Sequence, residues 1–154
     1  MTPETRSRVY AQLKIDEGVK YEIYLDHLGF KTFGIGHLCT PDDPEFEQGT
    51  ATPVSPQRVR ECFENDLDVS IAECEVLFGE NRWGSFPDEV QEICVNMMFN
   101  LGRPRYSKFV KHLEALDAED WAEAATEARD SKWYRQVGNR AERLCQRLEN
   151  LANE

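Results

Sequence analysis

The first hydrophobic pattern along the chain has the spacing of an amphipathic helix. Its apolar stripe consists of Val9, Tyr10 and Leu13. Thr2 precedes Pro3, which suits an N-cap followed by the first helical position, and Gly18 suits a left-handed stop. The pattern therefore predicts a helix over residues 3–17.

Glu17 is the residue of this helix best suited to acid chemistry. At about 100° per residue it falls near the middle of the apolar stripe, whereas Ile15 points away from it. A carboxyl group on a buried face loses solvation, which favours its protonated form near neutral pH. Glu17 is therefore the candidate general acid.

After the first helix the pattern changes to the two-residue period of strands. Ile23 and Leu25 alternate with the other residues of this stretch, and its polar edge ends in Asp26. Residues 27–30 suit a hairpin loop with Gly29 at the strained position. We expect Asp26, in a polar and wet setting, to stay ionised.

The returning strand offers an open face to a ligand. Its other face carries Phe33 and Ile35, and the open one carries Thr32, Gly34 and Gly36. Such small residues let a bulky ligand approach the backbone. One protonated and one ionised carboxyl group are what cleavage of a glycosidic bond requires, because one protonates the leaving oxygen and the other activates water. A Glu/Asp pair at this spacing is otherwise usually surface charge.

The stretch from Leu13 to Leu38, LKIDEGVKYEIYLDHLGFKTFGIGHL, resembles the active-site region of the phage T4-type lysozymes, glycoside hydrolase family 24. The resemblance implies that Glu17 is the general acid and that Asp26 and Thr32 position a water. Attack from the opposite side of the sugar would invert the anomeric centre. The implied substrate is the β-1,4 bond between N-acetylmuramic acid and N-acetylglucosamine of bacterial peptidoglycan, and no cofactor is needed because water is the only co-reactant.

The same resemblance implies supporting residues. His37 matches a family histidine that pairs with an aspartate, here Asp66; a catalytic base or metal ligand is the alternative for His37. Arg140 matches an arginine that contacts the catalytic glutamate, with a surface residue at a helix start as the alternative. The predicted substrate-side residues are Leu38, Phe99, Asn100 and Leu101.

The remainder of the chain is dominated by helical periodicity. Ser55 and Pro56 are typical of a helix start and precede a long stripe made of Val59, Cys62, Phe63, Leu67, Ser70, Ile71, Cys74 and Phe78. A second helix opens at Asp88 and ends at Gly102. Its core-filling methionines are Met97 and Met98. Shorter helices are expected around residues 109–116 and 121–128.

Two further residue types are expected on the surface. The polar, proline-interrupted stretch 41–53 predicts a loop in which Asp42 and Asp43 are solvated charges, since they lack the pattern of a calcium loop. His112 is most simply a surface residue.

The charge and the cysteine spacing disfavour two classes of function, nucleic-acid binding and metal binding. A formal net charge of −11 disfavours nucleic-acid binding and predicts that activity on anionic cell walls depends weakly on salt or rises with it. The five cysteines form no Cys-x-x-Cys pair, so we expect buried reduced thiols, no zinc site and no bound metal.

No stretch approaches the ~20 apolar residues of a membrane span, and the N-terminus lacks the hydrophobic segment of a signal peptide. We therefore expect synthesis in the host cytoplasm and action on the cell wall in the periplasm. The family resemblance suggests an endolysin that lyses the host, works as a monomer and crosses the membrane through a separate holin-type pore.

The sequence thus predicts an α+β, lysozyme-like fold over residues 1–154 as a single domain. A small lobe with a three-stranded antiparallel sheet is expected at about 18–58, and a mostly helical lobe from 1–17 and about 59–154, joined by the long helix. The alternative functions are a lytic transglycosylase on the same bond and a non-cleaving peptidoglycan-binding protein. A structural or DNA-packaging phage protein is disfavoured by the charge and the motif.

Overall fold

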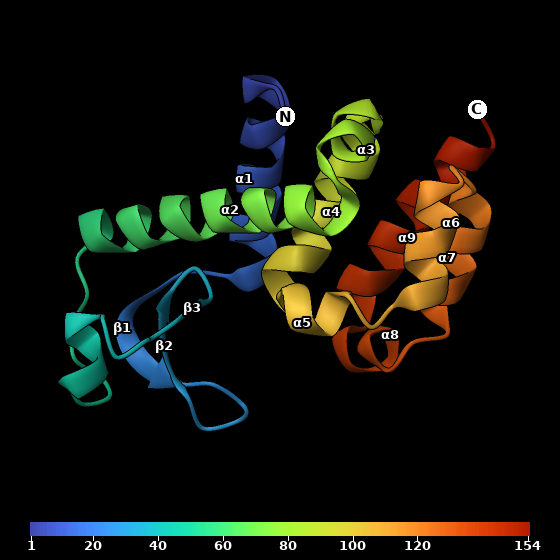
Figure 1. Cartoon of the computed structure of the whole chain (residues 1–154). Coiled ribbons are helices and arrows are strands. Elements are labelled where there is room, and N and C mark those ends of the chain that lie inside the picture. Colours follow the sequence, from blue (N-terminus) through green and yellow to red (C-terminus); the bar gives the residue numbers. More distant parts are fainter. The chain divides into compact units, whose positions relative to one another are not determined.

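The computed structural model describes all residues from Met1 to Glu154 (Figure 1). A small antiparallel sheet and many helices confirm the predicted α+β class. The helices are α1 (Pro3–Glu17), α2 (Pro56–Phe78), α3 (Glu80–Ser85), α4 (Asp88–Leu101), α5 (Arg103–Tyr106), α6 (Val110–Asp117), α7 (Trp121–Arg129), α8 (Lys132–Val137), α9 (Asn139–Ala152) and the 3-10 helix η1 (Pro44–Glu47). The strands are β1 (Lys20–Leu25), β2 (Lys31–Gly34) and β3 (His37–Leu38). None of the helices combines the length and the apolar character needed to cross a membrane.

The chain divides into two compact units. The sheet unit is Ser7–Val69, and the helical unit is Met1–Arg6 together with Ser70–Glu154. Both boundaries fall inside continuous helices, α1 and α2. The predicted lobe boundaries differ from this division, because residues 7–17 and 59–69 group with the sheet. That residues 1–154 form a single domain stays a prediction.

The predicted ends of the two longest helices are confirmed. The backbone N–H of Thr5 donates to Oγ1 of Thr2 at 3.2 Å, which caps the start of α1. At its other end Gly18 has a φ of 72°, the left-handed conformation expected of a helix stop. At the start of α2 the N–H of Arg58 donates to Oγ of Ser55 at 3.1 Å.

The sheet is antiparallel throughout, in the order β1-β2-β3. In the β1–β2 pair Tyr24 lies opposite Thr32, and the register shifts between Lys20 and Tyr24. Ile23 is 1% exposed but Leu25 is 53% exposed, so the two apolar residues of the alternating pattern differ in burial. The shifted register breaks the simple alternation, and Leu25 is the last residue of its strand.

Each unit has its own apolar core. The sheet unit buries Leu13, Ile23, Phe33, Phe63 and Leu67. In the helical unit α4 is buried along most of its length, including the predicted core methionines, and α7 packs against α6 and α9. All five cysteines are free and buried, which confirms the prediction of buried reduced thiols.

His112 corrects an expectation about the helical unit. It is 2% exposed, so the prediction of a surface residue is wrong. Its Nδ1 donates to the carbonyl oxygen of Ala124 at 2.8 Å, and its Nε2 lies 3.1 Å from the hydroxyl of Tyr106, which donates to the neutral ring. Burial lowers the pKa of His112 to about 4, which keeps the imidazole uncharged.

Candidate active site

One pocket of the sheet unit brings together the three predicted catalytic side chains. It is an open hollow of about 430 Å³ whose lining includes Glu17, Asp26 and Thr32. The other lining residues are Lys20, Tyr24, Leu25, His27, Gly36 and Leu38. The end of α1, the β1–β2 hairpin and β3 therefore surround a space of the size that small-molecule sites have. Leu38, predicted to lie on the substrate side, is among them.

Glu17 lies against the backbone of Gly36. A Cβ atom at Gly36 would lie 2.5 Å from Oε1 of Glu17 and 3.0 Å from its Cδ, so the Glu17 carboxyl would have to shift to make room for it. Gly36 also has a φ of 63°, a conformation that side chains disfavour. Both observations show why the segment between β2 and β3 needs glycine here: it lets the glutamate carboxyl reach this edge of the pocket.

Asp26 is fixed by the hairpin loop that follows it. Its Oδ1 accepts the backbone N–H groups of Leu28 and Phe30, each at 2.9 Å. The backbone N–H of Asp26 also donates to the carbonyl oxygen of Phe30 at 2.9 Å. One carboxylate oxygen is therefore used to orient the side chain, and these bonds leave Oδ2 for a ligand or a water.

Thr32 presents an acceptor to the pocket. It is 5% exposed, and its Oγ1 donates to the carbonyl oxygen of Phe30 at 3.1 Å. Because a hydroxyl has one proton and two lone pairs, the oxygen can still accept a hydrogen bond from a water. The same carbonyl oxygen of Phe30 thus links Thr32 to the backbone of Asp26.

Tyr24 is a pocket residue that the sequence analysis did not single out. Burial, then the negative charges of Glu17 and Asp26, raise the pKa of its phenol. The ammonium group of Lys20 lies 4.3 Å from the centre of the Tyr24 ring, in a cation–π contact. It lies opposite Thr32 in the β1–β2 pair, and its place two residues before Asp26 on the polar edge of the strand was the sequence signal that could have found it.

The sheet unit also holds a second group of polar residues, which follows the pocket residue Gly36 in the sequence. We call it the histidine cluster; it consists of His37, Asp43, Glu45, Arg58 and Asp66. The predicted pairing of His37 with Asp66 is present, with Nδ1 and Oδ2 2.6 Å apart. Nε2 of His37 lies 2.9 Å from Oδ2 of Asp43. Burial alone would lower the pKa of His37, but its hydrogen bonds to Asp66 and Asp43 and their charges raise it above the ordinary value.

Asp43 corrects another expectation. Its side chain is only 14% exposed, so the prediction of a solvated charge is wrong. Its Oδ1 accepts from Arg58 Nη2 at 3.0 Å, and its Oδ2 accepts from the N–H of Thr40 at 2.9 Å. Burial opposes ionisation, yet the bonds from Thr40 and His37 and the charge of Arg58 hold the pKa of Asp43 below its usual value. Arg58 also forms a two-pronged ion pair with Glu45, at 2.9 and 3.0 Å.

The other predicted site residues belong to the helical unit. Nε of Arg140 donates to Oδ1 of Asn96 at 2.9 Å. Asn100 accepts from the indole N–H of Trp133 at 2.7 Å, and Leu101 is buried. Phe99 is half-buried. The predicted roles of Arg140 toward Glu17 and of residues 99–101 toward the substrate stay predictions.

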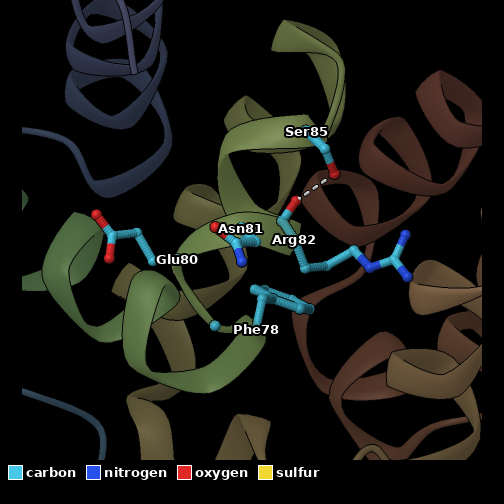
Figure 2. A pocket seen from close by; sticks show the side chains of 6 residues that line it. Phe78, Glu80, Asn81, Arg82 and Ser85 are labelled. Atoms are coloured by element: carbon cyan, nitrogen blue, oxygen red, sulfur yellow. Dashed lines mark hydrogen bonds between the residues drawn. The ribbon is translucent and has the colours of Figure 1, made fainter.

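The helical unit has a second hollow, lined by the end of α2 and by α3 (Figure 2). Figure 2 shows the side chains of Glu80 and Arg82 pointing to different sides, and the hydrogen bond drawn there runs from Ser85 to the carbonyl oxygen of Arg82 at 2.8 Å. Its lining holds a single carboxylate, so it lacks the paired acids of the sheet-unit pocket.

Comparison with known proteins agrees with the pocket chemistry. A family model described as phage lysozyme matches residues 14–150. Probable T4-type lysozyme 2 of Dictyostelium discoideum is 32% identical over 86% of this chain and 88% of that protein. Probable T4-type lysozyme 1 of the same organism is 29% identical over 93% of this chain and 94% of that protein. The pre-baseplate central spike protein Gp5 of Enterobacteria phage T4 is 30% identical over 86% of this chain but only 26% of that protein.

The chain belongs to the phage lysozyme family. The two Dictyostelium proteins match over most of their length and place the chain among the T4-type lysozymes, as the sequence resemblance predicted. The protein is accordingly a glycoside hydrolase with lysozyme activity on peptidoglycan.

Proposed function

We propose that this lysozyme hydrolyses the β-1,4 bond between N-acetylmuramic acid and N-acetylglucosamine with inversion of the anomeric centre. Glu17 is the general acid, and Asp26 and Thr32 hold the attacking water. The observation that carries the proposal is that all three side chains line one pocket of the sheet unit.

The proposed reaction is a single displacement. Glu17 gives its proton to the glycosidic oxygen while the bond from that oxygen to the anomeric carbon breaks. A water attacks the anomeric carbon from the opposite face of the sugar and loses its proton to Asp26. The products are two sugar ends, and the enzyme regains its starting state when the proton passes from Asp26 through solvent to Glu17.

The local bonds support this division of labour. Asp26 is oriented through Oδ1, which leaves Oδ2 to take the proton of the water. Thr32 donates to Phe30, so its oxygen can accept the second O–H of the same water. A water held by two acceptors presents its lone pair in a fixed direction, which is what an in-line attack needs.

Product analysis of purified peptidoglycan tests the proposal. We expect new reducing N-acetylmuramic acid ends, and the first-formed anomer, followed by proton NMR, should be the α-anomer. A 1,6-anhydro end would instead identify a lytic transglycosylase. An initial β-anomer would identify a retaining mechanism, and binding without any new ends would identify a non-cleaving wall-binding protein.

The biological role that we propose is that of an endolysin, supported by the phage lysozyme family alone. In this role the chain is made in the host cytoplasm, acts as a monomer without nucleic acid, and reaches the wall through a holin-type pore. Production in bacteria with and without a co-produced holin tests it. Lysis should require the holin, and equal lysis without it would contradict the proposed dependence on a pore.

A further inference from the structure

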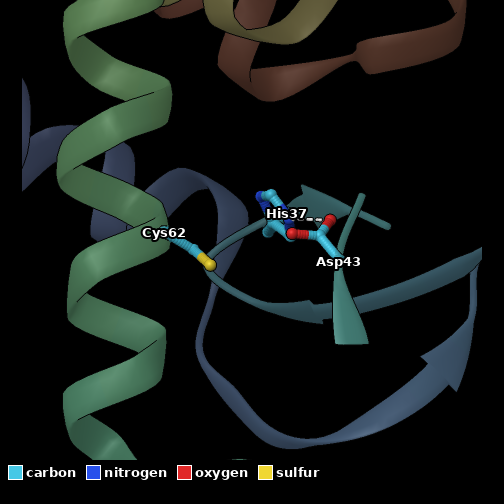
Figure 3. Close-up of side chains that lie close together, drawn as sticks. All are labelled: His37, Asp43 and Cys62. Carbon is cyan, nitrogen blue, oxygen red and sulfur yellow. Dashed lines mark hydrogen bonds and ion pairs between the residues drawn. The ribbon is translucent and has the colours of Figure 1, made fainter. Parts of the chain in front are cut away.

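Although the spacing of the cysteines predicted no zinc site, we propose that His37, Asp43 and Cys62 form a binding site for a divalent transition-metal ion of the zinc class. Their ligand atoms all lie within 4.8 Å of one another. The three side chains come from β3, from the loop before η1 and from α2, and Figure 3 shows them together at this junction of the sheet unit. The site is separate from the lysozyme pocket, whose lining contains none of the three.

The donor set is the mixture that zinc prefers. An imidazole nitrogen, a carboxylate oxygen and a thiolate sulfur are its three ordinary protein ligands, and a water completes the tetrahedron when the protein supplies three. Calcium and magnesium, which take oxygen ligands almost exclusively, do not suit a site with a thiolate.

The present separations are close to those of a tetrahedral site. Bonds of about 2.0–2.3 Å put neighbouring ligand atoms about 3.3–3.6 Å apart. Nε2 of His37 and Oδ2 of Asp43 are 2.9 Å apart and must separate by a few tenths of an ångström. Sγ of Cys62 belongs to the same group, whose ligand atoms all lie within 4.8 Å of one another.

The surrounding bonds already orient two of the ligands. Nδ1 of His37 is held by Asp66 at 2.6 Å, so Nε2 is the nitrogen directed toward the site. A carboxylate on the far nitrogen of a metal-binding histidine is the usual outer support of zinc sites. Asp43 is held by Arg58 on Oδ1 and by the backbone of Thr40 on Oδ2.

Burial and charge also fit a bound dication. His37 is buried and Cys62 is only 5% exposed, so a bound ion would be shielded from competing water. A zinc ion would replace the thiol proton of Cys62, and the carboxylates of Asp43 and Asp66, both bonded to His37, would offset the remaining positive charge of the ion.

Titration of the folded protein with Co²⁺ tests the site. Cobalt bound to a thiolate gives a near-ultraviolet charge-transfer band, which we expect to saturate at one ion per chain and to disappear when Zn²⁺ is added. Cys62→Ser should abolish the band. Asp66→Asn, which removes only the outer support, should weaken affinity by about 10–100-fold.

Cys39→Ser is the matched control, because Cys39 is a buried free thiol of the same unit outside the group of three. It should keep the band. Asp43→Asn leaves the thiol in place, so it still tests the site if Cys62→Ser does not fold. We expect it to weaken Zn²⁺ binding at least tenfold, measured in competition with a chromophoric chelator. A wild-type protein without a saturable band, or a band that survives in Cys62→Ser or vanishes in Cys39→Ser, would overturn the proposal.

Discussion

The pocket and the histidine cluster are both polar, both belong to the sheet unit, and meet where Gly36 is followed by His37. Their side chains are used in opposite ways. In the cluster both ring nitrogens of His37, both oxygens of Asp43 and the guanidinium of Arg58 are bonded to protein groups. In the pocket Asp26 is oriented through one oxygen only.

This difference in hydrogen bonding distinguishes polar groups that stabilise the fold from polar groups that can still bind a ligand. A buried ion pair that loses one partner leaves an uncompensated charge and destabilises the fold. Replacing a pocket acid that can still bind a ligand should change the stability of the ligand-free protein little. Substitutions in the cluster should therefore change stability first, and substitutions in the pocket should change activity first.

Glu17→Gln should give the largest effect. It removes the proposed acid while keeping its shape, so clearing of cell walls should fall by about 10²–10⁴-fold. The midpoint of thermal unfolding should change little. Glu22→Gln is the matched control, since Glu22 is an exposed glutamate on β1 outside the pocket lining, and it should keep wild-type activity. Equal activity of Glu17→Gln and wild type would remove Glu17 from the mechanism.

Asp66→Asn should have the opposite effect, a loss of stability with little loss of activity. It removes the charged partner of Nδ1 of His37, and a charge-assisted hydrogen bond of this kind contributes about 2 kcal/mol. Urea unfolding near pH 5.5 measures the loss, and wall clearing below the unfolding range should persist. A large activity loss without destabilisation would show that the cluster takes part in the reaction directly.

Gly36→Ala probes the boundary between the two regions. The left-handed conformation should cost about 1–2 kcal/mol, and the new Cβ would displace the Glu17 carboxyl, so activity should fall as well. Gly79→Ala separates the two effects, because Gly79 has a φ of 84° but no atom within 4 Å of an added Cβ. It should lose stability and keep activity; if both variants lose activity equally, the contact with Glu17 is unimportant.

The pH dependence of stability should come from the cluster. The raised pKa of His37 means that its contribution is complete below its unfolded value near 6.5 and is lost as pH rises through the folded value. The lowered pKa of Asp43 means that its contribution is present above its unfolded value and is lost as pH falls through the folded one. Unfolding free energies measured between pH 3 and 9 should thus be highest between these limits, and His37→Gln should flatten the decline on the alkaline side.

Salt should have the smallest effect. The net charge of −11 gives no long-range attraction to an anionic wall, so added NaCl should leave wall clearing nearly unchanged or raise it by screening repulsion. Wall clearing in chloride salts at constant pH, with a short soluble peptidoglycan fragment of few charges as the control substrate, measures this. A steep fall in wall clearing with salt would show that a local positive surface, rather than net charge, guides binding.

The sequence predicted what local patterns control. Thr2 and Gly18 fix the ends of α1 by chemistry within a few residues, so these ends could be predicted. The three proposed catalytic residues lie in one short stretch, so their meeting in one pocket could also be expected. Asp43 and His112 were misjudged because their partners are distant in the chain: Arg58 for Asp43 and Ala124 for His112.

Two other features depend on how the strands meet. Leu25 faces solvent because the β1–β2 register shifts, which residue alternation does not encode. Tyr24 comes under the charges of Glu17 and Asp26 only once α1 and the hairpin are folded together. Sequence patterns grouped the residues that line the pocket, and they missed the side chains whose surroundings are assembled from separate elements.

The run Gly36-His37-Leu38 has a consequence for how this enzyme can evolve. Gly36 lies against the Glu17 carboxyl, His37 belongs to the histidine cluster, and Leu38 lines the pocket. An insertion or deletion here would shift all three assignments at once, so neither region can be remodelled alone at this point. Changes meant to alter substrate preference should leave this tripeptide untouched and should also keep the backbone of residues 28–30, which orients Asp26 and Thr32.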